Sequence, residues 1–199
     1  HVTGIDSSAE MIESAKQKYP LGSFRIASVT SLPFSKNFDA IFSNAVLHWV
    51  LEKEKAAEQM YQALKNSGRL VVEFGGRGNI SHIVEALKKT LEKYGFSELA
   101  KKEIWYFPSI GEYTSLLEKQ GFRVLVATHF DRDTLLKDDR GIKNWLRMFA
   151  GPFLEGLDSR QEEMILNDVE QQLKPTNFHN GLWYADYKRL RIEAVKEKD

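Results

Sequence analysis

The stretch that decides the fold is Phe38-Asp-Ala-Ile-Phe-Ser-Asn-Ala-Val-Leu-His-Trp-Val50. Its first part, Ala40–Phe42, is apolar on consecutive residues, which is typical of a strand buried on both faces of a parallel sheet. The polar pair Ser43-Asn44 ends this run, and His48 and Trp49 follow shortly after. Because open α/β sheets bind ligands at the carboxyl ends of their strands, these residues are predicted to border a ligand site.

Strand and helix patterns alternate on both sides of this stretch. Upstream, a short β-like segment, His1–Ile5, ends on Asp6 and precedes a helix that a capping box at Ser7–Glu10 would begin. Downstream, a helix over Glu52–Leu64 leads to an apolar strand, Leu70–Phe74. This repeated βαβ pattern predicts an α/β protein with a parallel sheet and crossover helices.

The C-terminal part of the chain interrupts the sheet pattern. After an alternating strand at Phe122–Phe130, residues 131–181 contain two helical stretches that are rich in Trp and Phe. A last strand is predicted at Leu182–Val195, where apolar and charged residues alternate. We therefore predict a Rossmann-like domain at 1–130 and 182–199, and a helical lid at 131–181 that covers the strand ends.

The composition argues against several classes of function. The 199 residues include 28 Lys and Arg and 28 Asp and Glu, so no net charge directs the protein to nucleic acid or an anionic membrane. The chain has no Cys, which excludes disulfides, thiolate metal sites and cysteine nucleophiles. No apolar run reaches the roughly 20 residues of a membrane span. We predict a cytoplasmic protein without a metal site that binds neither nucleic acid nor membrane; its oligomeric state stays open.

An ordered set of motifs resembles the class I S-adenosylmethionine-dependent methyltransferases. The motifs are Val2–Asp6 with Ser8, Met11 and Ile12, then Leu32-Pro33-Phe34, then the Phe38–Val50 stretch, then Leu64-Lys65 with Gly68. Within this superfamily, the chain most resembles trans-aconitate 2-methyltransferase and its relatives. That similarity lies in Asn44-Ala45-Val46 with Trp49, and later in Trp145-Leu146-Arg147, Pro152-Phe153-Leu154 and Arg189-Leu190.

The resemblance also implies a missing part. In the family, a first strand and its Gly-rich E/D-x-G-x-G-x-G loop precede the residues equivalent to His1. We therefore expect a Rossmann-like methyltransferase sheet that is mostly parallel, with an antiparallel last strand and the first strand absent from this chain. A sheet without that strand would expose two inner edges. We expect the upstream coding sequence to supply the strand and the loop.

The resemblance implies a site for S-adenosylmethionine. The cofactor-binding residues would be Asp6 and Ser7 at the ribose, Ser28 and Val29 at the adenine edge, and Asn44 and Ala45 near the methionine part. Ser28 replaces the Asp or Glu that the family often has, which implies a weaker contact to adenine. On its own segment, Asp6 reads equally well as a helix-start residue that interacts with the helix dipole.

His48 and Trp49 are predicted to face the methyl acceptor as catalytic residues. Trp145, Arg147 and Arg77 are predicted to bind it, with Arg147 as the best bidentate carboxylate clamp and Arg77 and Arg189 as weaker candidates. Core packing is an alternative for both tryptophans, and a structural hydrogen bond for His48. Arg77 lies in Gly75–Gly78, which follows a late strand and is therefore interpreted as a turn and not as a phosphate-binding loop.

Three functions remain open at this point. The first is O-methylation of a small carboxylic acid, whose carboxylate is already ionised at neutral pH, so alignment and exclusion of water would supply most of the catalysis. The second is methylation of a phenol, amine or thiol, with His48 as a general base. The third is an inactive fragment, or a module that binds a partner through its exposed sheet.

Overall fold

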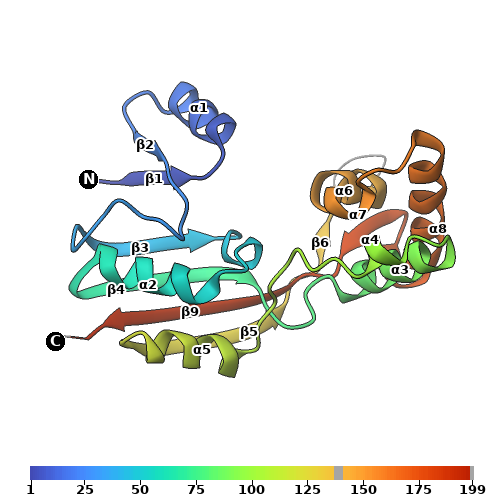
Figure 1. Ribbon diagram of the computed structural model, residues 1–199. Coiled ribbons are helices and arrows are strands. Elements are labelled where there is room, and N and C mark those ends of the chain that lie inside the picture. Colours follow the sequence, from blue (N-terminus) through green and yellow to red (C-terminus); the bar gives the residue numbers. More distant parts are fainter. Residues whose placement is uncertain (137–140, 198–199) are drawn as a thin grey trace. The chain divides into compact units, whose positions relative to one another are not determined.

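The computed structural model describes residues 1–136 and 141–197 (Figure 1). The chain forms two compact units. The first comprises His1–Glu73, Ile110–Ala127 and the segment that begins at Arg191, and the second comprises Phe74–Ser109 and Thr128–Leu190. The second unit thus includes residues 74–109 in addition to most of the predicted lid, and residues 137–140 of that lid lie outside the described part.

The first unit begins with a βαβ element. Strand β1 (Thr3–Asp6) pairs in parallel with β2 (Ser23–Ile26), and helix α1 (Ala9–Lys18) connects them (Figure 1). The helix is capped by Ser8, whose hydroxyl accepts a hydrogen bond from the Met11 amide at 3.2 Å. The predicted cap at Ser7 is therefore wrong by one residue.

A second βαβ element contains the stretch quoted above. Strand β3 (Phe38–Asn44) pairs in parallel with β4 (Leu64–Gly75), and a short 3-10 helix, η1 (Leu47–Trp49), and helix α2 (Lys53–Ala63) connect them. Four apolar residues of α2 share one face and are buried, namely Ala56, Ala57, Met60 and Ala63. These residues explain why the segment forms a helix on the sheet.

The strands form more than one sheet. The larger sheet has the order β3-β4-β9-β5, with β9 at Lys188–Lys196 and β5 at Phe122–Asp131, and helix α5 (Ile110–Lys119) precedes β5. The arrow of β9 points opposite to that of β3, so the sheet is mixed (Figure 1). Among the described residues, β1 and β2 form a separate two-stranded sheet. The described strands thus form separate sheets, and the predicted absence of a first strand stays a prediction.

A buried lysine joins β9 to α2 in the first unit. Lys196 is almost fully buried, and its Nζ donates to the carbonyl oxygens of Tyr61 (2.9 Å) and Leu64 (3.1 Å). These carbonyls lie at the carboxyl end of α2, where a positive charge interacts favourably with the helix dipole. The contact holds the last strand against the helix.

The second unit is mainly helical. Its helices are α3 (Ser81–Lys93), α4 (Ser97–Ala100), α6 (Gly141–Phe149), α7 (Gly151–Leu154) and α8 (Ser159–Asn177). A small antiparallel sheet has the order β6-β8-β7, with β6 at Thr134–Leu135, β7 at Phe178–His179 and β8 at Leu182–Ala185. The single strand predicted for Leu182–Val195 is therefore wrong, because it is divided into β8 and β9.

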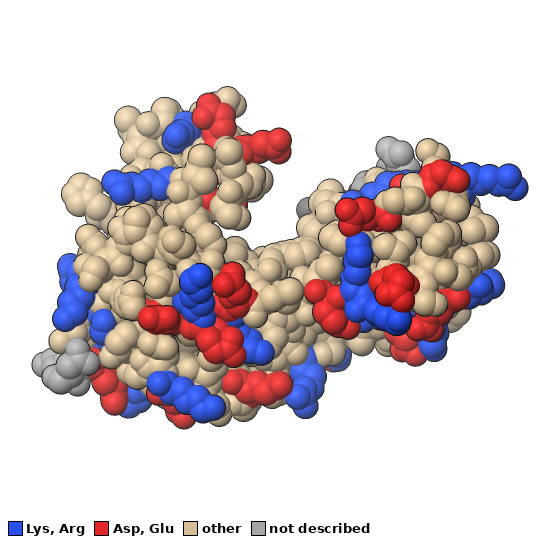
Figure 2. Space-filling model, in the orientation of Figure 1, with Lys and Arg blue, Asp and Glu red and all other residues tan. Residues whose placement is uncertain are grey.

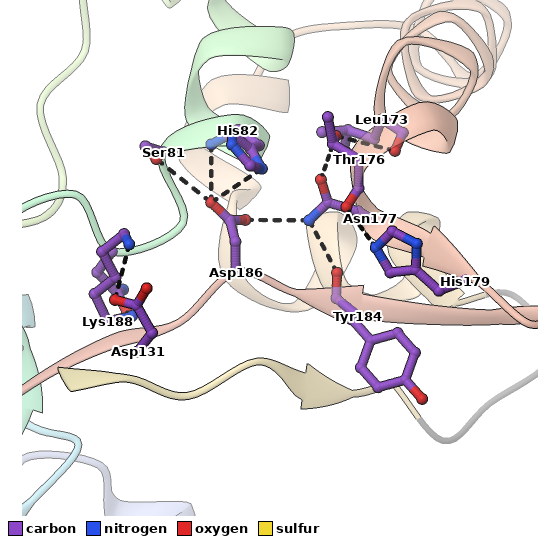
Figure 3. A network of polar contacts seen from close by, with 11 residues as sticks. Ser81, His82, Asp131, Leu173, Thr176, Asn177, His179, Tyr184, Asp186 and Lys188 are labelled. Carbon is purple, nitrogen blue, oxygen red and sulfur yellow. Dashed lines mark hydrogen bonds and ion pairs between the residues drawn. The ribbon is translucent and has the colours of Figure 1, made fainter.

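Asp186, between β8 and β9, explains this division (Figure 3). Its Oδ2 accepts from the His82 amide at 2.9 Å, at the start of α3, and its Oδ1 accepts from Asn177 Nδ2 at 3.2 Å. Helix α3 has no side-chain cap at its preceding residue, because Ile80 (φ 52°) has an apolar side chain without a hydrogen-bond acceptor. A distant carboxylate therefore satisfies the exposed amide and interacts with the positive end of the helix dipole.

Charges of both signs are mixed on the visible surface. Figure 2 shows acidic and basic side chains interspersed on the face that it presents. Among residues 1–136 and 141–197, no helix is long and apolar enough to cross a membrane.

Candidate functional site

Asp6 lies at the carboxyl end of β1. Its Oδ1 accepts a hydrogen bond from the Ser8 amide at 2.8 Å, and its backbone carbonyl accepts from Ala27 at 3.0 Å. Asp6 therefore acts at the start of helix α1, which is one of the two roles that the sequence suggested. A carboxylate has about four lone-pair sites, so this single bond leaves acceptor capacity for ligand hydroxyls. Ser7 is exposed beside it.

Ser28 and Val29 lie at the same end of the β1–β2 sheet. Asp6 is in register with Ile26, and the loop with Ser28 follows two residues later. The Ser28 hydroxyl accepts from the Thr30 amide at 3.2 Å and shares a hydrogen bond with the Thr30 hydroxyl at 2.8 Å. The structure thus brings the residues predicted for ribose and adenine to one edge, and Ser28 also stabilises its own turn.

A strained turn ends β3. Ala45 has a left-handed conformation (φ 58°), and its amide donates to the Glu73 carbonyl at 2.8 Å. A non-glycine residue in this region costs about 1 kcal/mol or more, and such conformations are often found at functional sites. His48 follows in η1 and is buried, whereas Trp49 is 42% exposed. The centroids of the His48 and Trp49 rings lie 5.4 Å apart. Of the two predicted catalytic side chains, Trp49 is therefore the more accessible.

An ion pair that the sequence did not predict lies at this edge of the sheet. Glu73, in register with Asn44, is only 8% exposed, and its Oε2 accepts from Arg191 Nε at 2.7 Å and Nη2 at 2.6 Å. A signal was available, because Glu73 is a charged residue inside the apolar run Leu70–Phe74. Buried carboxylates are rare unless paired, so its position in the strand pointed to a partner.

The predicted acceptor residues of the second unit lie in different surroundings. Trp145 is buried in the helical core, and its Nε1 donates to the Tyr187 hydroxyl at 2.8 Å. The Nε of Arg147 donates to Glu162 at 2.8 Å and its Nη2 to Glu163 at 2.7 Å. Both carboxylates, Glu162 first, raise the pKa of Arg147 above its usual value. Residues two apart on a helix do not share a face, so α6 does not bring Trp145 and Arg147 together, and their substrate role stays a prediction.

The Gly75–Gly78 segment is a turn within the second unit. The amide of Gly76 donates to the Lys188 carbonyl at 2.9 Å, and that of Arg77 donates to the Pro108 carbonyl at 2.8 Å. These amides are directed at protein carbonyls, which differs from a phosphate-binding loop. The Arg77 residue is exposed, and its predicted contact with the acceptor stays a prediction.

Known proteins resemble this chain over nearly its whole length. A family model described as a methyltransferase domain matches residues 1–72, which include Asp6, Ser28 and Asn44. An uncharacterized methyltransferase of Schizosaccharomyces pombe is 32% identical, over 98% of this chain and 78% of that protein. A trans-aconitate 2-methyltransferase of Rhizobium etli is 25% identical, also over 98% of this chain and 78% of that protein.

The fold is shared with solved structures. A Bacillus halodurans protein provisionally described as a methyltransferase superposes with a TM-score of 0.66 at 11% identity, covering 99% of this chain and 83% of that one. At this identity, the similarity shows a Rossmann-like methyltransferase fold and nothing finer.

Proposed function

Since this chain belongs to the class I S-adenosylmethionine-dependent methyltransferases, with S-adenosylmethionine as its methyl donor, we propose that it methylates a carboxylate oxygen of a small organic acid. The observation that supports this acceptor is the similarity to a trans-aconitate 2-methyltransferase over 98% of the chain. The donor supplies a methyl group on a sulfonium, whose bonding pair stays on sulfur when the acceptor oxygen forms the new bond. An ionised carboxylate needs no base for this step.

The first unit has side chains that fit the adenosine half of the donor. We propose that the Asp6 carboxylate accepts hydrogen bonds from the ribose hydroxyls, because it retains acceptor sites and lies at a strand end. Ser28 and Val29 follow the neighbouring strand at the same edge and would contact adenine. Asn44 and Ala45 would approach the methionine part. The protein would contribute alignment and exclusion of water.

We further propose that the working enzyme has one more strand between β1 and β3, with a Gly-rich loop at its end. In the described residues, β1 pairs only with β2, and β3 pairs only with β4. Phe42 of β3 is 74% exposed, which is unusual for an apolar strand residue next to a core. Calorimetry should detect S-adenosylhomocysteine binding to the gene-length protein and much weaker binding to residues 1–199. Equal affinity of the two forms would contradict this strand.

A panel of acceptors tests the acid assignment. The gene-length protein is incubated with S-adenosylmethionine labelled in the methyl group and with di- and tricarboxylic acids, phenols, amines and thiols. We expect label in a methyl ester, which mild alkali releases as methanol. Label only in a phenol, amine or thiol would reject the acid and favour an acceptor that needs deprotonation, with His48 as the candidate base.

A further inference from the structure

Glu73 places a buried negative charge at the carboxyl ends of β3 and β4. It is in register with Asn44, and its carbonyl accepts the amide of Ala45 at 2.8 Å. The residue therefore belongs to the same strand ends as the turn to which we assign the methionine part of the donor. Polar side chains at this edge of an open α/β sheet are in the region where such folds bind ligands.

Arg191 of β9 pairs with this charge, and the two side chains differ in exposure. Its Nε and Nη2 both donate to Oε2 of Glu73, at 2.7 Å and 2.6 Å. The Glu73 side chain is 10% exposed, whereas the Arg191 side chain is 56% exposed. A buried carboxylate thus holds a solvent-accessible guanidinium in a defined plane by two charge-assisted hydrogen bonds.

The two side chains lie on one face of the sheet. Along β4, Leu70 and Val72 are fully buried and alternate with Glu73, and along β9, Ile192 is fully buried and follows Arg191. Because neighbouring residues of a strand point to opposite faces, the ion pair lies on the face opposite these three apolar residues. The guanidinium therefore lies on the face opposite these apolar residues, near the carboxyl ends of β3 and β4, and is not directed into the apolar core.

We propose that Arg191 binds a carboxylate of the methyl acceptor and that Glu73 is the residue that positions Arg191. This inference rests on the proposed function, since it presumes an acidic acceptor. A guanidinium has five N–H donors in a fixed fork and keeps its charge at any physiological pH, so it binds a carboxylate bidentately. The bound carboxylate differs from the one that is methylated, so the acceptor carries at least two acid groups.

The experiment compares Arg191→Met, Glu73→Gln and the double variant with the parent enzyme. The double variant removes both charges, which avoids leaving the Glu73 carboxylate buried without its cation. Arg69→Met is the matched control, because Arg69 on the same β4 strand pairs with Glu193 of β9 at 3.6 Å, nearer the amino end of β4. KM and kcat are measured for the preferred diacid and for its monoester at the carboxylate that the enzyme does not methylate, and S-adenosylhomocysteine affinity is measured by calorimetry.

We expect Arg191→Met and the double variant to raise KM for the diacid by about 30-fold or more, since a charge-assisted pair is lost. Glu73→Gln should raise the same KM less, and Arg69→Met should leave it unchanged. S-adenosylhomocysteine affinity should change less than twofold in all variants. The parent should already bind the monoester more weakly than the diacid, and this preference should disappear in Arg191→Met.

Two results would overturn the proposal. One is an unchanged diacid KM in the folded double variant. The other is an equal loss for diacid and monoester, or a parallel loss of S-adenosylhomocysteine affinity, because a merely structural ion pair would act on all ligands alike. Failure of the acid assignment is separately visible, because the parent enzyme would then methylate no acid, and Arg191 would be rejected with it.

Discussion

The Asp6→Asn substitution separates two roles that the structure places on one side chain. Oδ1 of Asp6 accepts the Ser8 amide at 2.8 Å, next to the cap of α1. An asparagine carbonyl can accept the same bond, so the start of the helix should be kept. What the substitution removes is the negative charge that would face the two ribose hydroxyls of the cofactor.

The expected loss follows from the two kinds of hydrogen bond. A bond to a charged group contributes about 1.5–3 kcal/mol and a neutral one about 0.5–1.5 kcal/mol, so each hydroxyl loses about 1 kcal/mol. Two hydroxyls give about 2 kcal/mol, which is a fall of about 30-fold in affinity. Asp6→Ala should cost more, because it also removes the acceptor of the Ser8 amide.

Calorimetric titration with S-adenosylhomocysteine measures this effect, and circular dichroism checks that each variant is folded. The control is Asp39→Asn, at an exposed carboxylate of β3 that pairs with Lys65 at 2.9 Å. The control should bind like the parent protein. A folded Asp6→Asn variant with the affinity of the parent would remove Asp6 from the cofactor site and refute the reasoning.

Three other predictions concern stability. The Lys93 ammonium, 2.7 Å from Asp168, holds the pKa of that carboxyl below its usual value. The pair therefore contributes to the free energy of unfolding above the unfolded-state pKa of Asp168. This contribution is lost as pH falls through the lower folded-state pKa. Urea unfolding should therefore show a smaller loss of stability between pH 5 and pH 2 (about the range of a titrating Asp) in Asp168→Asn than in the parent. Lys196→Met removes two bonds to carbonyls of α2 and should lower the free energy of unfolding by about 1–3 kcal/mol, where an unchanged denaturant midpoint would argue against the contact. Trp145→Phe removes the bond to Tyr187 and should cost about 1–2 kcal/mol in the same assay, and a raised acceptor KM in this variant would support the predicted substrate role.

Local patterns determined most helices and strands, because each pattern reports which face of an element is apolar. The pattern over Glu52–Leu64 predicts the helix observed at Lys53–Ala63, and the apolar run Leu70–Phe74 lies within β4. The prediction failed at Leu182–Val195, where an alternating pattern continues through the break. The cause is Asp186, whose carboxylate accepts from the amide of His82, 104 residues earlier, at the start of a helix. No pattern within the segment contains that partner.

The same distinction applies to the site. Motif order singled out Asp6, Ser28 and Asn44 as candidate cofactor residues, because each lies at or just after the end of its own strand and needs no distant partner to be recognised. Charged residues are different, because a sequence shows where a charge is but not what neutralises it. The sequence did not show a partner for Arg147, whereas in the fold its guanidinium pairs with Glu162 and Glu163. Glu73 and Arg191 are 118 residues apart and meet only because β4 and β9 are neighbours in the sheet, so the tertiary structure alone decided which cation lies at the strand ends.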